Sequence, residues 1–105
     1  SARPGQLAPH AWCDDGRSLY DLFGAGFALL VADTADESEV AKAERDAREV
    51  GVPLEVVRPR GVAVAELYRA QLALVRPDQH VAWRGDRWQP VLRRAAGFAE
   101  ARAAS

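Results

Sequence analysis

The chain has 105 residues, a formal net charge of −1, 49% hydrophobic and 28% charged residues. This length suffices for one domain with a modest core, and the balanced charge argues against nucleic-acid or anionic-membrane partners. No apolar stretch approaches the roughly 20 residues of a membrane-spanning helix and no signal peptide opens the chain, so we expect a cytoplasmic protein.

The first elements predicted along the chain are short and separated by turns. Residues 1–8 are rich in proline, glycine and small side chains, which is typical of a linker. Residues 10–13 have an extended pattern that ends at a DDG turn signal. Ser18 is predicted to cap a short helix, SLYDLFG, and Asp21 three residues later completes a capping box.

The middle of the chain predicts strand, helix, strand. Residues 26–33 are nearly all apolar, which is typical of a central strand covered on both faces. The segment that follows predicts the longest helix, capped by Thr34 or Asp36 and ended by Gly51, with acidic residues in its first turn. Residues 54–57 predict the next strand.

The last part predicts a hairpin and a terminal helix. Residues 63–68 suit one turn of helix, and the apolar runs 71–75 and 80–83 predict two strands. The RPDQ segment between these strands has Pro and Asp where a type I turn favours them, so the strands are predicted to be antiparallel. A helix interrupted by Gly97 is predicted from Pro90 onward.

This order of elements predicts an α/β domain: a mixed thioredoxin-like sheet flanked by helices and closed by the hairpin and the last helix. Both halves of a thioredoxin-type redox site are missing. Residues 32–37, where the CxxC motif would stand, contain three acidic residues and no cysteine, and Tyr68-Arg69-Ala70 replaces the cis-proline. We therefore expect no thiol–disulfide activity.

The remaining chemistry-bearing side chains are scattered. Cys13 is the only cysteine, which excludes an intramolecular disulfide, and the two aspartates after it disfavour a negatively charged thiolate. We interpret Cys13 as structural. His10 and His80 are the only histidines and lie in no cluster of metal ligands. The adjacent carboxylates Asp14 and Asp15 are expected to point into water.

Short motifs add little. Neither GxGxxG nor GxxxxGK[ST] occurs, so the chain has no recognisable nucleotide site. Arg84-Gly85-Asp86 is interpreted as a turn because nothing indicates secretion. The chain has three tryptophans, which is a large number for so small a core: Trp12, Trp83 and Trp88. Because tryptophan is enriched at interfaces, we expect one or two of them to contact another domain.

Two blocks of sequence resemble a known family. PHAW, DGRSLYDLFG and GF lie within residues 9–27, and LVRPDQHVAWR spans residues 74–84. Together they resemble the C-terminal thioredoxin-like domain of FAD-dependent aromatic-ring hydroxylases, the phenol hydroxylase and polyketide hydroxylase group. The resemblance covers residues 9–105 as a single domain. Cys13 departs from the aliphatic residue expected at its position.

The resemblance implies a non-catalytic structural or interaction domain. The parent protein of such a domain uses NAD(P)H to reduce FAD and then O2 to hydroxylate an aromatic or polyketide substrate. Its FAD site and substrate pocket lie in a larger N-terminal part, so no catalytic, cofactor-binding or metal-ligating residue carries over to this chain. The domain packs on the N-terminal FAD and substrate domains of the same polypeptide and contributes to homodimer contacts in some members.

We therefore expect interdomain contacts from His10, Trp12, His80, Trp83 and Arg84. The chain contains no methionine, which leads us to expect further sequence upstream of Ser1. Two alternatives stay open: a free-standing, redox-inactive thioredoxin-like module that binds other proteins, and a thiol enzyme working through Cys13.

Overall fold

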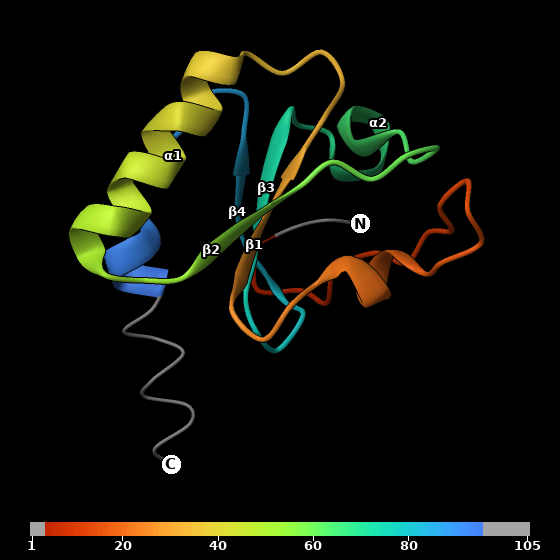
Figure 1. Ribbon diagram of the computed structural model, residues 1–105, viewed down its shortest axis with the longest axis horizontal. Helices are drawn as coiled ribbons and strands as arrows, with labels where there is room; N and C mark the ends of the chain where they lie inside the picture. The colour runs from red at the N-terminus through yellow and green to blue at the C-terminus, as the bar shows by residue number, and fades with distance from the viewer. Residues whose placement is uncertain (1–3, 96–105) are drawn as a thin grey trace.

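The computed structural model describes residues 4–95. Within this range, four strands form one sheet in the order β2-β1-β3-β4 (Figure 1). The parallel pair is β1 with β2, whereas β3 is antiparallel to both β1 and β4. The mixed sheet predicted from the order of elements is therefore confirmed. Its strands are β1 (Phe27–Val31), β2 (Leu54–Val57), β3 (Leu72–Val75) and β4 (Val81–Gly85).

The long helix is confirmed as α1 (Glu37–Val50). Asp36, rather than Thr34, is its N-cap, because the Asp36 carboxylate accepts a 2.9 Å hydrogen bond from the backbone N–H of Ser38. Gly51 ends the helix with φ of 78°, a left-handed conformation that glycine adopts without steric cost.

The capping box at Ser18 is confirmed, with the Asp21 carboxylate accepting the Ser18 backbone N–H. The element it starts is a 3-10 helix, η1 (Leu19–Leu22), which is shorter than predicted because Phe23 is already extended. The extended segment 10–13 does not join the sheet, which corrects the prediction of a strand there. Trp12 forms only an isolated bridge, with Ser18, because the DDG turn folds the chain back on itself.

Residues 5–8, within the predicted linker, lie against the edge of the sheet. The Gly5 N–H donates to the Val81 carbonyl at 2.6 Å, the Val81 N–H to the Gln6 carbonyl at 2.7 Å, and the Ala8 N–H to the Gln79 carbonyl at 2.8 Å. Ala8 is buried in the core beneath. This segment therefore caps the start of β4.

The predicted β3–β4 hairpin is confirmed, with changed ends. His80 lies just before β4, which runs on to Gly85. The Gln79 N–H donates to the Arg76 carbonyl at 2.9 Å, and Gln79 itself has φ of 67°. This is the pattern of a turn followed by a left-handed residue, which lets a three-residue loop close a hairpin. A register shift follows at Leu74/Val75.

Each face of the sheet is covered by a separate apolar core. Helix α1 and the helical residues 92–95 cover one face, while η1, α2 (Val64–Tyr68) and Ala8 cover the other. The predicted terminal helix is thus present as far as it is described, and Gly97 lies outside the described residues. The α1 face is built from Phe27, Leu29, Val31, Val40, Ala43, Ala47, Leu72, Leu74, Trp88 and Leu92.

Candidate functional site

Two large apolar side chains are conspicuously exposed among residues 4–95, and both belong to the segment that enters the domain. Trp12 is 66% exposed and Leu7 is 52% exposed. His10, also exposed, lies between them in sequence. These residues, which lie within six positions of one another in the sequence, are called the entry patch: Leu7, His10 and Trp12. Figure 1 shows the red and orange segment that carries them on the side of the sheet away from α1.

The aromatic part of the entry patch is held in place by contacts within the domain. The His10 ring makes edge contacts with Trp12, at 4.8 Å between ring centroids, and with Tyr20, at 5.2 Å. His10 Nε2 and Ser18 Oγ share a 2.9 Å hydrogen bond. The Tyr20 hydroxyl donates to the Ala8 carbonyl. An exposed indole is therefore presented on a stack that is anchored at several points.

The other residues predicted to contact a neighbouring domain are engaged inside this one. Arg84 Nη1 donates to the Tyr68 carbonyl at 2.9 Å. His80 Nδ1 lies 3.1 Å from the carbonyl oxygen of Asp78. Trp83 is partly buried, with its ring 5.1 Å from that of Trp88. The structure therefore brings His10 and Trp12 together and leaves His80, Trp83 and Arg84 in the hairpin.

The Arg84-Gly85-Asp86 tripeptide is a structural element. Asp86 Oδ1 accepts the backbone N–H of Gln71 at 2.9 Å, while Arg84 binds the carbonyl at the end of α2. Both charged side chains therefore tie the end of β4 to the α2–β3 connection.

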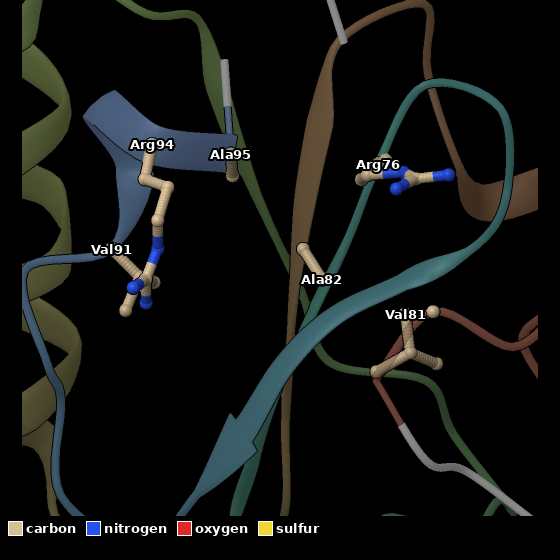
Figure 2. A pocket seen from close by; sticks show the side chains of 7 residues that line it. Arg76, Val81, Ala82, Val91, Arg94 and Ala95 are labelled. Atoms are coloured by element: carbon tan, nitrogen blue, oxygen red, sulfur yellow. The ribbon is translucent and has the colours of Figure 1, made fainter. Parts of the chain in front are cut away.

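A cavity of about 220 Å³ lies beside β4, as Figure 2 shows. Its lining is mostly apolar, and its two arginines do not converge: the Arg76 guanidinium points away from the helix that carries Arg94 and Ala95. Arg76 already binds the Asp78 carboxylate through Nε at 3.0 Å and Nη2 at 2.6 Å. The cavity therefore lacks the few convergent polar groups that orient a small ligand.

A larger, open cavity of about 550 Å³ borders Cys13. Two of the three arginines that line it are already held in ion pairs, because Arg17 binds Asp15 at 2.7 Å and Arg58 binds Glu37 through two 2.7 Å hydrogen bonds. Cys13 is buried, and the described residues place no histidine against it as a base. This arrangement does not suit a nucleophilic thiol.

No group of three or more His, Cys, Asp or Glu residues within 4–95 is placed to hold a metal ion. None of the helices in that range is long and apolar enough to cross a membrane.

The start of α1 does not suit a flavin or nucleotide cofactor. A helix N-terminus binds pyrophosphate through free backbone N–H groups, usually after a glycine-rich turn. Here the Asp36 carboxylate occupies the cap, and hydrogen bonds from Ser38 lower its pKa. The hydrogen bond from Arg58 lowers the pKa of Glu37. Two charged carboxylates at this end would repel a phosphate, so the start of α1 does not suit the pyrophosphate of FAD.

The sequence predicted contacts from Trp12 and His10 but did not single out Leu7, which lies in the segment assigned to a linker. It also missed the supporting role of Tyr20. The arrangement as a whole offers a rigid aromatic surface and no constellation for acid–base, nucleophilic or metal chemistry among the residues described.

Comparison with known protein families shows the family of this chain. The profile of the family described as "Aromatic-ring hydroxylase, C-terminal" matches residues 1–104. The chain belongs to this family. The resemblance seen in the two sequence blocks is therefore confirmed.

Similar proteins are larger enzymes. The chain is 39% identical over 99 residues to aklavinone 12-hydroxylase RdmE of Streptomyces purpurascens, covering 82% of this chain and 18% of that protein. It is 37% identical over 86 residues to the FAD-dependent monooxygenase apdD of Emericella nidulans, covering 79% of this chain and 14% of that protein. The chain thus spans less than a fifth of the length of either enzyme.

Solved structures of the family share the fold. The rebeccamycin biosynthetic enzyme RebC, solved with reduced flavin, matches with a TM-score of 0.76 and 42% identity over 90% of this chain and 19% of that one. Aklavinone-11 hydroxylase, solved with FAD and aklavinone, matches with a TM-score of 0.70 and 34% identity over 90% of this chain and 21% of that one.

Proposed function

We propose that this chain is the non-catalytic C-terminal domain of an FAD- and NAD(P)H-dependent monooxygenase that hydroxylates an aromatic or polyketide substrate. Its role is to pack against the N-terminal FAD and substrate domains of the same polypeptide. The observation that carries the proposal is the family match over residues 1–104 by a chain about a fifth as long as the enzymes it resembles.

Two features of the structure support a non-catalytic role. The start of α1 carries charged carboxylates in the place where a redox thiolate or a phosphate would need positive potential. Two of the three arginines beside Cys13 are held in ion pairs, and the lining of the cavity that borders Cys13 includes no histidine to act as a base for the thiol. FAD, NAD(P)H and the aromatic substrate would accordingly be held by residues outside this chain.

The alternative of a free-standing interaction module has less support, because the matching enzymes carry this domain as a minor part of a longer protein. The proposal includes contacts between two copies of the parent as a further use of the domain. It also includes a cytoplasmic location, which suits a chain whose single cysteine forms no disulfide within it.

The test compares the longer polypeptide that carries this chain with a version that ends before Ser1. We expect both to bind FAD and to reduce it with NAD(P)H, and the truncated version to unfold at a lower temperature. If the truncated version does not fold, the 105-residue chain is titrated alone with FAD instead. Stoichiometric FAD binding by the 105-residue chain, or a longer polypeptide without flavin, would overturn the proposal.

A further inference from the structure

We propose that the entry patch, Leu7, His10 and Trp12, is the surface on which the preceding part of the same polypeptide docks. This inference rests on the proposed function and adds to it the side of the domain that faces the catalytic body.

The entry patch exposes apolar side chains to solvent. Trp12 and Leu7 stand out as exposed large apolar residues among those described, at 66% and 52%. Exposed tryptophan is a frequent anchor of interfaces, because its indole buries a large apolar area and fixes few rotatable bonds. The indole N–H of Trp12 has no hydrogen-bond partner within residues 4–95, so it is available to an acceptor on the opposing surface.

The aromatic part of the entry patch is already ordered for binding. The bridge between Trp12 and Ser18, the stack of His10 between two aromatic rings, and the Ser18–His10 hydrogen bond hold the indole outward. A side chain that is already ordered loses less conformational entropy on association than a mobile one.

The position of the patch in the chain identifies the occupant. Residues 5–8 lie along the start of β4, so Leu7 stands close in sequence to the point where a preceding part of the polypeptide would be attached. The family profile describes a C-terminal domain, and four fifths of each similar enzyme lies outside the matched part. A covalently attached partner has a high effective concentration at such a point, so a small patch suffices.

The chemistry of the patch specifies the opposing surface. It should offer an apolar hollow for an indole and an isobutyl group, together with an acceptor for the indole N–H. The exposed Asp15–Arg17 ion pair, which begins three residues after Trp12, would supply a polar rim. The opposite side of the domain differs, because the outer face of α1 carries Lys42, Glu44, Arg45 and Arg48.

The test is covalent footprinting of the 105-residue chain and of the longer polypeptide, read by mass spectrometry. Hydroxyl radicals label Trp12 and Leu7, and acetic anhydride labels Lys42, the only lysine of the chain. We expect labelling of Trp12 and Leu7 to fall by about fivefold or more in the longer polypeptide, as for side chains at the dry centre of an interface. Labelling of Lys42 should stay unchanged.

Other outcomes overturn the inference in distinguishable ways. Protection of Lys42 with Trp12 still reactive would mean docking through α1, which leaves the proposed function intact. Protection of Trp12 that appears only at high protein concentration would assign the patch to a second copy of the chain. No protection anywhere, in a polypeptide that binds no FAD, would overturn both proposals.

Variants provide a second measurement. In the longer polypeptide, Trp12→Ala should restore labelling of Leu7 and lower the unfolding temperature, whereas the control Arg45→Ala on exposed α1 should do neither. Both variants should leave the FAD content of the longer polypeptide unchanged. Trp12→Ala should lower the unfolding temperature of the longer polypeptide by more than that of the 105-residue chain, where it removes only the edge contact with His10. Equal behaviour of the two variants in the longer polypeptide would overturn the inference.

Discussion

The Glu39 carboxylate accepts a 2.6 Å hydrogen bond from the backbone N–H of Trp88, which follows 49 residues later in the chain. Its second oxygen binds Lys42 Nζ at 2.7 Å, and the Asp46 carboxylate accepts the Trp88 indole N–H at 3.3 Å. Helix α1 thus fixes the segment after β4 through carboxylates two turns apart. This contact places Trp88 over the core on the α1 face.

Replacing Glu39 should loosen that segment. Hydrogen bonds from Lys42 and from the Trp88 N–H lower the pKa of Glu39, so the native state favours its charged form. We expect Glu39→Gln to lower the unfolding temperature and Glu39→Ala to lower it further, because alanine also leaves a buried N–H without an acceptor. Thermal unfolding followed by tryptophan emission measures this. The exposed Glu44→Gln is the control, and equal midpoints for all three variants would contradict the role given to Glu39.

The fully buried Tyr68 hydroxyl has no hydrogen-bond partner among residues 4–95. Burial raises the pKa of this phenol, a sign of its poor solvation. Tyr68→Phe should therefore increase the free energy of unfolding by about 1 kcal/mol, since it keeps the ring and removes an unpaired polar group. Tyr20→Phe is the matched control and should reduce stability, because the Tyr20 hydroxyl donates to Ala8. Urea denaturation decides between them, and a destabilised Tyr68→Phe would contradict this account.

The hairpin turn should depend on acid pH through Asp78. The hydrogen bond from Arg76, followed by that from the His80 backbone N–H, lowers the pKa of Asp78 to about 2. The unfolded chain then binds the proton more readily, so this stabilisation is present above about pH 4 and is lost as the pH falls through about 2.

Asp78→Asn should therefore reduce the free energy of unfolding at neutral pH by about 1 kcal/mol, a value discounted because Asp78 is partly exposed. The loss should vanish near pH 2. Denaturation curves at pH 7 and pH 2 test both statements, with the exposed Asp33→Asn as the control. A loss of the same size at both pH values would show that charge is not the cause.

Gly61 lies in the β2–α2 loop, where it packs closely against Asp14 of the DDG turn. It has φ of 80°, and a Cβ built on it would overlap the Asp14 carboxylate and lie 3.0 Å from the Asp14 backbone nitrogen. Gly51 has nearly the same φ, 78°, but open space around it. Gly51→Ala should therefore cost about 1 kcal/mol of backbone strain and Gly61→Ala more, and urea denaturation compares them. Equal losses would contradict the packing of the DDG turn on this loop.

Local signals predicted much of the fold. The Ser18–Asp21 box and the Gly51 stop each depend on residues only a few positions apart, so the sequence alone predicts them, whereas the N-cap of α1 stayed open between Thr34 and Asp36. The alternation of helix and strand indicated parallel strands joined by a crossover. The short turn between the last two strands indicated an antiparallel hairpin, so the sheet was expected to be mixed.

Contacts between distant segments could not be predicted in the same way. Glu39 has the pattern of a solvent-facing acid on an amphipathic helix, and only the Trp88 N–H explains its burial. Residues 5–8 have the composition of a linker. Their hydrogen-bond partners lie at the start of β4, more than 70 residues later in the chain, so local sequence could not reveal them. Arg84 binds a backbone carbonyl, a partner that no side-chain motif reveals. The aromatic stack at His10 depends on a fold-back that the pattern of residues 10–13 does not specify.

The most direct test of the central claim is a titration of the purified 105-residue chain with FAD, followed by equilibrium dialysis and flavin absorbance, beside the longer polypeptide. We predict that the longer polypeptide retains flavin and that the 105-residue chain retains none. A stoichiometric yellow chromophore on the 105-residue chain would contradict the assignment of this domain as a non-catalytic partner of the flavin-binding part.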